Sequence, residues 1–121
     1  MGVVLILDCN DLDLEADFWT AALHYQEVHR DEPYLVLMPR EGDGSGLVLQ
    51  LQRVPEHKTG KNRLHLDLHV DAVEREVDRL VALGARPLSD ATEESGFLWR
   101  VMADPEGNEF CVCSRCADDS S

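Results

Sequence analysis

The chain has 121 residues, enough for one domain or two small intertwined halves, and its 44% hydrophobic content is sufficient for a packed core. Its 24 acidic residues outnumber 11 basic ones, and the resulting net charge of −13 would repel nucleic acids and anionic membranes. No apolar run reaches the roughly 18 residues that a membrane-spanning helix needs. We therefore expect neither a nucleic-acid partner nor a membrane partner.

The first half of the chain predicts one helix among four strands. Asp11 is the predicted N-cap of the helix, because a side-chain oxygen at this position accepts a hydrogen bond from a free N–H group. The apolar stripe of the helix ends near Leu23. A turn is expected at Glu32-Pro33. The four strands are expected at residues 3–7, 26–31, 34–38 and 47–52.

The second half repeats this order after a polar connector at residues 54–62. Asp71 is the predicted N-cap of the second helix, with Glu74 three residues later as in a capping box. Gly84 suits the residue that follows the helix end. The DPEGN sequence at 104–108 predicts a tight turn before the last strand. The strands are expected at residues 63–70, 86–88, 97–103 and 109–113.

Two copies of a βαβββ module are therefore predicted, one at residues 1–53 and one at residues 63–113. Asp11 aligns with Asp71 and Leu23 aligns with Leu83, so the two halves register at an offset of 60. The expected fold class is α+β. In the strand at 63–70, strict alternation places leucines on one face and ionisable residues on the other, namely His65, Asp67 and His69.

Three segments resemble motifs of the vicinal oxygen chelate superfamily, which includes glyoxalases, bleomycin resistance proteins and extradiol dioxygenases. The resemblance implies a single glyoxalase-like domain at 1–121, in which the modules form a curled, cup-shaped mixed sheet with the helices outside. It also implies a small molecule bound in the cup, and a homodimer that buries open sheet edges. The three segments are DLDLEADFWTAALHY, NRLHLDLHVDAVEREVDRLVALGA and DPEGNEFCV.

The same resemblance implies one metal ligand on the first and last strands of each module. Because leucine donates nothing and a divalent metal needs three or four donors, we expect a degenerate metal site and no cofactor. A divalent metal stays open as an alternative, since a one-residue bulge could turn Gln50 or Gln52 into the site. At the four ligand positions stand Leu5, Leu51, His65 and Cys111, of which His65 alone is a family-type ligand.

The cup is expected to combine apolar walls with one polar group. Asp67 would orient His65, and the two side chains form a candidate general acid/base pair. The alternatives are a solvated strand face for His65 and a core position for Trp99. For His69 the structural interpretation is favoured, because it lies near the strand end. The predicted ligand contacts are Leu5, Leu51, His65, Trp99 and Cys111.

A cluster of basic residues lies in and beside the connector. Lys58, Lys61 and Arg63 stand within six positions of one another in a chain with 11 basic residues. They predict an anion-binding rim of the cup, with a solvated loop as the alternative.

The cysteines lack the spacing of a secreted disulfide framework, so a reducing, cytoplasmic setting is expected. A structural zinc site formed by the CxCxxC sequence is the alternative to unpaired thiols. The cysteines are Cys9, Cys111, Cys113 and Cys116.

Two classes of function follow from these features. The first is a glyoxalase-like protein that binds or sequesters a small, partly apolar molecule. The second is a metal-independent enzyme of the lyase or isomerase type that uses His65 with Asp67. A metal-dependent glyoxalase or dioxygenase activity is disfavoured by the lost ligands.

Overall fold

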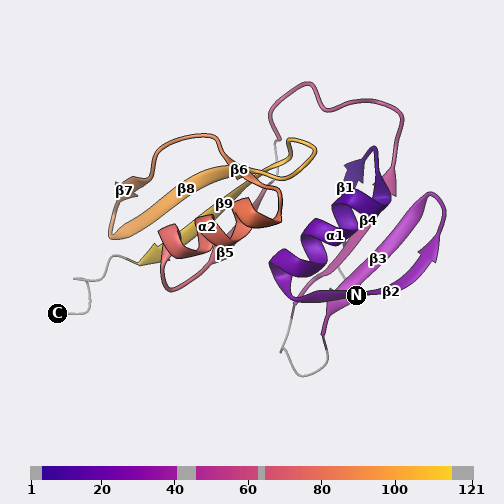
Figure 1. The fold of residues 1–121 in the computed structure, drawn as a ribbon, viewed down its shortest axis with the longest axis horizontal. Coiled ribbons are helices and arrows are strands. Elements are labelled where there is room, and N and C mark those ends of the chain that lie inside the picture. Colours follow the sequence, from indigo (N-terminus) through magenta and orange to yellow (C-terminus); the bar gives the residue numbers. More distant parts are fainter. Residues whose placement is uncertain (1–3, 41–45, 63–64, 116–121) are drawn as a thin grey trace. The chain divides into compact units, whose positions relative to one another are not determined.

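A computed structural model describes residues 4–40, 46–62 and 65–115 of the chain (Figure 1). Two compact units are present, Met1–Lys58 and Thr59–Ser121, and each is described by itself. The boundary between them falls inside the predicted connector. Within the described residues, no helix is long and apolar enough to span a bilayer.

The first unit has the predicted βαβββ order. Its four-stranded sheet runs β1-β4-β3-β2, with β1 and β4 parallel and the other pairs antiparallel. The elements are β1 (Val4–Cys9), α1 (Leu12–Leu23), β2 (Tyr25–Asp31), β3 (Tyr34–Pro39) and β4 (Val48–Arg53).

Helix α1 forms where the sequence predicts it. Oδ1 of Asp11 accepts a hydrogen bond from the Leu14 N–H at 3.1 Å, so the predicted N-cap is confirmed. Phe18 and Trp19 are buried, with ring centroids 5.0 Å apart in an edge-to-face contact. The helix contacts β2, β3 and β4. The side chains that β3 and β4 bury in this core are Leu35, Leu37, Leu49 and Leu51.

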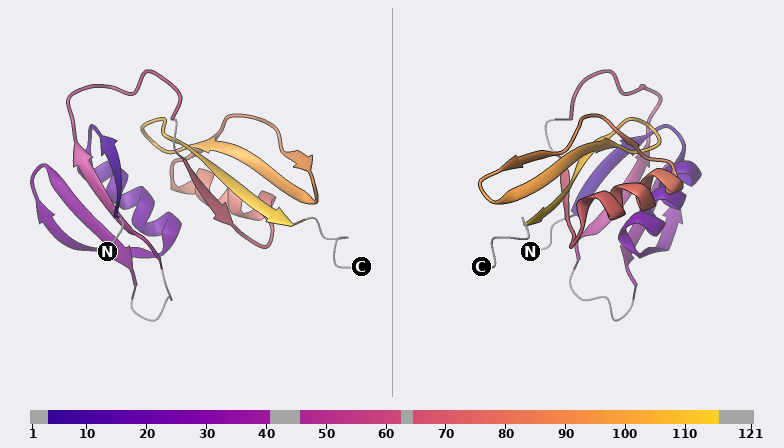
Figure 2. Two further views of the ribbon diagram at one scale, coloured as in Figure 1. Left: turned by 180° about the vertical axis from the view of Figure 1, so that it is seen from behind. Right: turned by 60° about the vertical axis from the view of Figure 1, so that its left-hand side comes forward.

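The second unit contains an α2 helix along one face of a five-stranded sheet (Figure 2). The sheet runs β5-β9-β8-β6, with β7 also paired to β8, and β5 is parallel to β9. The α+β fold class is thus confirmed, and β7 is a strand beyond the prediction. The elements are β5 (Leu66–His69), α2 (Val73–Leu83), β6 (Arg86–Pro87), β7 (Thr92–Glu94), β8 (Phe97–Ala103) and β9 (Glu109–Arg115).

The start of α2 differs from the prediction and its end agrees with it. The N-cap is Ala72, without a side-chain hydrogen bond, so the capping box predicted for Asp71 and Glu74 is wrong. The Glu74 carboxylate instead accepts a hydrogen bond from Arg100 at 3.0 Å. Gly84 ends the helix with a φ of 118°, a left-handed conformation that suits glycine.

The turn between β8 and β9 forms as the DPEGN sequence predicts. Asp104 is fully buried, and its Oδ1 accepts hydrogen bonds from the N–H groups of Glu106 and Asn108, each at 2.9 Å. Nδ2 of Asn108 donates to Oδ2 of Asp104 at 3.0 Å. Gly107 adopts a φ of 90°. These bonds fix the register in which β8 meets β9.

The predicted offset of 60 between the two halves is wrong for the strands. The helices end at equivalent caps, His24 and Gly84, which are 60 positions apart, but they begin at Asp11 and Ala72, which are 61 apart. The difference arises because α1 has 12 residues and α2 has 11. Strands β1 and β5, which precede the helices, are therefore related by 61.

Burial along the last strands supports the same offset of 61. In each unit the first strand pairs with the last strand in an equivalent parallel register, so both strands share one offset. Leu51 in β4 and Val112 in β9 are both fully buried, whereas Gln50 and Cys111 are both half-buried. Gln50, not Leu51, therefore corresponds to Cys111.

Candidate functional site

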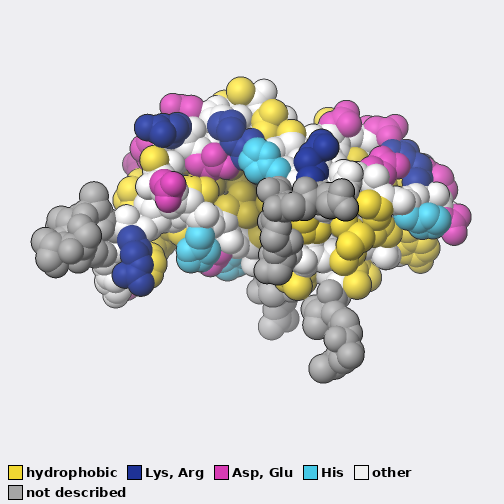
Figure 3. Space-filling model, turned by 90° about the horizontal axis from the view of Figure 1, so that it is seen from below, with side chains coloured by type: hydrophobic (Ala, Val, Ile, Leu, Met, Phe, Trp, Pro, Cys, Tyr) yellow, Lys and Arg dark blue, Asp and Glu magenta, His cyan; other side chains and the backbone are white. Residues whose placement is uncertain are grey.

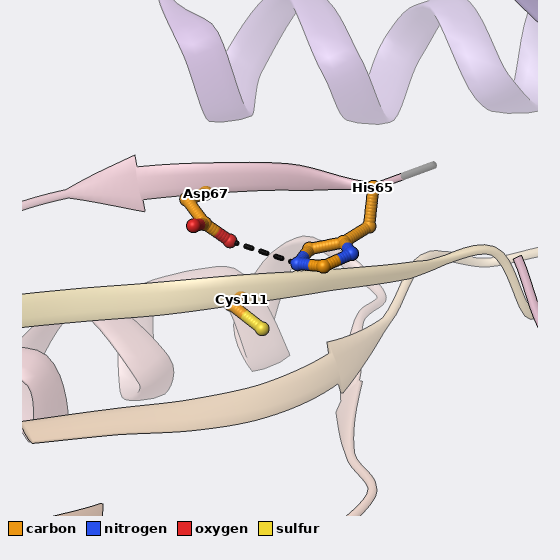
Figure 4. A group of neighbouring side chains, drawn as sticks. All are labelled: His65, Asp67 and Cys111. Atoms are coloured by element: carbon orange, nitrogen blue, oxygen red, sulfur yellow. Dashed lines mark ion pairs between the residues drawn. The ribbon is translucent and has the colours of Figure 1, made fainter. Parts of the chain in front are cut away.

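Side chains of β5, β9 and β8 meet on one face of the second sheet. Asp67 lies opposite Cys111, and Cys111 lies opposite Val101. Because paired residues project from the same side of a sheet, these side chains share a face. His65 precedes Asp67 by two positions and joins them there (Figure 4). The next row across the same strands consists of His69, Cys113 and Trp99.

This face and the β7–β8 hairpin line an open cavity of about 440 Å³ within the second unit. Its size is within the range of small-molecule sites. One part of the lining carries nitrogen, oxygen and sulfur atoms, from His65, Asp67, His69, Cys111 and Cys113. The other part is largely aromatic, with Glu94 and Ser95 beside Phe97 and Trp99.

The lining residues Glu94, Ser95 and Phe97 were not found from the sequence. Ser95 and Gly96 have φ values of 55° and 81°, and two consecutive positive φ angles are typical of a type I′ hairpin turn. Glu94 and Phe97 face each other directly across that turn. The Ser-Gly pair at 95–96 is the feature of the sequence from which this hairpin turn could be predicted. The polar TEE sequence of β7 lacks the apolar alternation that predicts a strand.

His65 and Asp67 form the polar pair that the alternation predicts. Nε2 of His65 lies 3.1 Å from Oδ1 of Asp67, and both side chains are about half exposed (Figure 4). When Nε2 carries the proton, it donates to the carboxylate, and Nδ1 remains as a proton acceptor. This is the arrangement in which a carboxylate orients an imidazole for acid/base work.

The two cavity thiols are held in their neutral form. Burial and the nearby Asp67 carboxylate raise the pKa of Cys111 to about 11. Burial and the same carboxylate also raise the pKa of Cys113. Since a thiolate is the reactive species, neither cysteine is prepared to act as a nucleophile at neutral pH.

The donors do not reproduce the four-ligand metal site that the resemblance implies. With the offset of 61, the first-unit positions are Val4, which has no donor atom, and Gln50, whose amide oxygen is a possible ligand, as the alternative with a shifted register predicts. Nitrogen, oxygen and sulfur atoms of His65, Asp67 and Cys111 do lie within 4.8 Å of one another. These three donors all belong to the second unit, and the degenerate state of the family metal site stays a prediction.

The structure brings together part of the predicted ligand-binding set. His65, Trp99 and Cys111 line one cavity with Asp67. Leu51 is buried in the core of the first unit, on the side of β4 opposite Gln50. The offset of 60 assigns this buried side of β4 to the pocket, whereas the offset of 61 assigns the Gln50 side. Leu5 is half-buried and shares the Leu51 side of the sheet through the β1–β4 register. That these two leucines contact a ligand stays a prediction.

The structure does not test the predicted anion-binding rim. Lys58 and Lys61 fall in different units, and Arg63 lies outside the described residues. Lys61 is close enough to Cys111 to lower the pKa of the thiol slightly, and this is the smallest of the effects that act on it. The rim remains a prediction.

Solved structures share this fold over nearly the full chain. A glyoxalase/bleomycin resistance protein/dioxygenase family enzyme from Burkholderia phytofirmans PsJN has a TM-score of 0.72 at 19% identity, covering 93% of this chain and 96% of that one. A glyoxalase-related enzyme from Fulvimarina pelagi has a TM-score of 0.73 at 23% identity, covering 95% and 88%. The fosfomycin resistance protein FosX from Listeria monocytogenes has a TM-score of 0.76 at 13% identity, covering 100% and 98%. At these identities the likeness concerns the fold alone.

A family model described as a glyoxalase-like domain matches residues 4–113. The chain therefore belongs to the glyoxalase-like domain family, within the vicinal oxygen chelate superfamily that its motifs indicate. No match was found among the curated proteins compared. Members of this superfamily bind small molecules, which agrees with a cavity on the open face of the second sheet.

Proposed function

We propose that this protein binds a small, partly apolar molecule in the cavity of its second unit, without a metal ion. The observation that carries the proposal is the division of the cavity into two chemical parts. Phe97 and Trp99 provide apolar surface, while the His65–Asp67 pair provides a directional polar contact. A molecule with an apolar end and a hydrogen-bonding end suits both parts.

The cavity tryptophan offers a direct test. Trp99 lines the cavity, whereas Trp19 is buried in the core of the first unit. In protein labelled with ¹⁵N-tryptophan, a small-molecule library should contain compounds that shift the Trp99 indole signal in a saturable manner and leave Trp19 unchanged. The two signals are assigned with Trp99→Phe. If every compound that binds leaves the Trp99 signal unchanged, the cavity is not the binding site.

A second candidate function is acid/base catalysis of the lyase or isomerase type. The 3.1 Å contact between His65 and Asp67 favours it, because the pair leaves one imidazole nitrogen able to move a proton of a bound molecule. A compound found with the Trp99 signal would then be converted, with a change visible by mass spectrometry. Asp67→Asn should slow the conversion more than it weakens binding. A compound that returns chemically unchanged after long incubation supports binding alone.

We also propose that the protein works as a homodimer in a reducing cytoplasm. Val4 and Ile6 of the edge strand β1 are 48% and 56% exposed, and open edges with apolar side chains favour association. Cys111 and Cys113 are free thiols, as a reducing compartment maintains. Light scattering after size exclusion should give twice the chain mass of 13.6 kDa. A monomer mass at every concentration would contradict the dimer.

A further inference from the structure

We propose that the cavity selects a positively charged organic molecule with an aromatic or other flat apolar body, such as an aromatic amine or quaternary ammonium compound. This inference rests on the proposed binding function and adds the charge class of the ligand. It follows from the charge of the lining, from the aromatic residues beside the carboxylates, and from a cation that the protein already holds against one of these rings.

The charge of the lining is one-sided. Among the described residues that line the cavity, Asp67 and Glu94 are carboxylates and none is a lysine or arginine. The rest of the lining is aromatic, sulfur-containing, hydroxyl-bearing or imidazole. A cavity with low-dielectric walls and charges of one sign concentrates the field of those charges. Entry is therefore electrostatically favourable for a cation and unfavourable for an anion.

Two arginines of the second unit are paired with carboxylates outside the cavity lining. The Arg100 guanidinium donates to Glu74 at 3.0 Å, and the Arg79 guanidinium pairs with Glu76 at 2.6 Å. On the face shown in Figure 3, Lys and Arg side chains lie among Asp and Glu side chains. Lys61 and Arg115 lie beside the lining residues Cys111 and Phe97. The net charge of −13 still gives the chain a large excess of carboxylates over basic groups.

Phe97 and Trp99 line the same cavity as the two carboxylates. Phe97 faces Glu94 across the β7–β8 hairpin, and Trp99 follows on the same side of β8. A ring face attracts a cation through its quadrupole, and tryptophan does so most strongly. An aromatic residue next to a carboxylate is therefore a favourable setting for an ammonium group.

The protein itself shows that such a ring holds a cation. The guanidinium carbon of Arg115 lies 5.5 Å from the ring centroid of Phe97, within the distance of a cation–π contact. Arg115 comes from β9, directly opposite Phe97 in the strand register. Arg115 projects from the same side of the sheet as Cys111 and Cys113, so a ligand cation would share the Phe97 ring with Arg115 or lie against Trp99.

The test uses three probes of similar shape and different charge: benzyltrimethylammonium, benzyl alcohol and benzylphosphonate. Each is titrated into ¹⁵N-tryptophan-labelled protein, with the Trp99 indole signal as the readout and Trp19 as the internal control. Benzyltrimethylammonium should bind at least about tenfold more tightly than the other two, and added salt should weaken its binding. Glu94→Gln should weaken it about threefold to tenfold.

The matched control is Glu93→Gln. Glu93 lies on the same short strand but alternates to the other face, and its substitution removes the same charge from the chain. It should change the affinity by less than about twofold. If Glu93→Gln weakens binding as much as Glu94→Gln, the surface charge and not the cavity selects the cation, and the inference is overturned.

The remaining outcomes separate this inference from the function on which it rests. If benzyl alcohol or benzylphosphonate shifts the Trp99 signal at equal or lower concentration than the cation, the cavity binds small molecules but does not select cations. Preference for the phosphonate would favour the predicted anion rim around Lys61. If no probe moves the Trp99 signal, both this inference and the proposed binding function are contradicted.

Discussion

Asp67 of β5 lies directly opposite Cys111 of β9, and the same carboxylate meets the His65 imidazole at 3.1 Å. One carboxylate therefore acts on two functional groups. It orients the imidazole through a hydrogen bond, and it helps to raise the pKa of the thiol. The polar groups of the site are thus arranged around a carboxylate of the second sheet. In the metal-dependent proteins that the motifs resemble, a metal ion is the central charge.

Replacing His65 with leucine should separate its role in binding from any role in folding. The side chain is 47% exposed and lies outside the core, so His65→Leu should change the free energy of unfolding by less than about 0.5 kcal/mol. Affinity for a ligand identified through the Trp99 signal should fall by about 1–3 kcal/mol, the usual cost of losing a buried polar partner. Urea unfolding and NMR titration measure the two effects.

His29→Leu is a suitable control for this substitution. His29 is an exposed histidine in β2 of the first unit, so the same chemical change there should leave ligand affinity unaltered. If His65→Leu unfolds the protein, or leaves binding unchanged while His29→Leu weakens it, His65 is structural and the proposed site is wrong.

The purified protein should carry no stoichiometric transition metal. Val4 stands at one of the four family ligand positions and supplies no donor, so the four-ligand set of the family is incomplete. Elemental analysis and native mass spectrometry after gentle purification measure the content. One tightly bound zinc, nickel or iron per chain, lost in both His65→Ala and Cys111→Ser, would show that the three donors of the second unit suffice.

Local signals in the sequence were enough to predict most of the elements. Asp11 caps α1, Gly84 ends α2, and the DPEGN sequence forms its turn, because each depends on interactions within a few residues. The polar face of His65 and Asp67 was also predictable, since period-two alternation in that strand is unambiguous. These features do not depend on how distant segments pack.

The inward face of the first unit could not be predicted in the same way. β1 has apolar residues on both faces, with Ile6 exposed beside the half-buried Leu5 and Leu7, so alternation there does not show which side meets α1. The offset of 60 relates Leu5 to His65 and Leu51 to Cys111, and so predicts that these leucines face the pocket. The extra residue in α1 makes that offset 61 along the strands and inverts the face.

Removing the buried carboxylate of the β8–β9 turn should destabilise the second unit. Asp104 is fully buried and accepts hydrogen bonds from two backbone N–H groups and from Asn108. Asp104→Ala leaves these donors without an acceptor, so the free energy of unfolding should fall by about 2–4 kcal/mol. Asp90→Ala, at an exposed position, should change it by less than about 0.5 kcal/mol. Equal effects of the two substitutions in urea unfolding would contradict this account of the turn.

The raised pKa of Cys111 predicts a slow, strongly pH-dependent reaction with alkylating reagents. Burial is the largest cause and the Asp67 carboxylate the next, and together they raise the pKa to about 11 from an ordinary value of 9.0. Because the thiolate reacts, alkylation of Cys111 by iodoacetamide in the folded protein should keep accelerating up to about pH 11. Peptide mass spectrometry at a series of pH values measures the rate at this cysteine.

Asp67→Asn removes one cause of the shift and should make Cys111 react faster near pH 9, the ordinary pKa. Glu94→Gln is the control, because Glu94 lines the same cavity but is not among the causes of the shift.

The raised pKa of Cys111 also makes the free energy of unfolding depend on pH, because the folded and unfolded chains then bind different numbers of protons. Between pH 9 and 11 the unfolded chain loses the Cys111 proton first, so the folded state loses stability as the pH rises through this window. Cys111→Ser should lack that loss. If Cys111 in the folded protein instead reacts at its full rate near pH 8, or if Glu94→Gln accelerates the reaction as much as Asp67→Asn, the Asp67 carboxylate does not control the thiol.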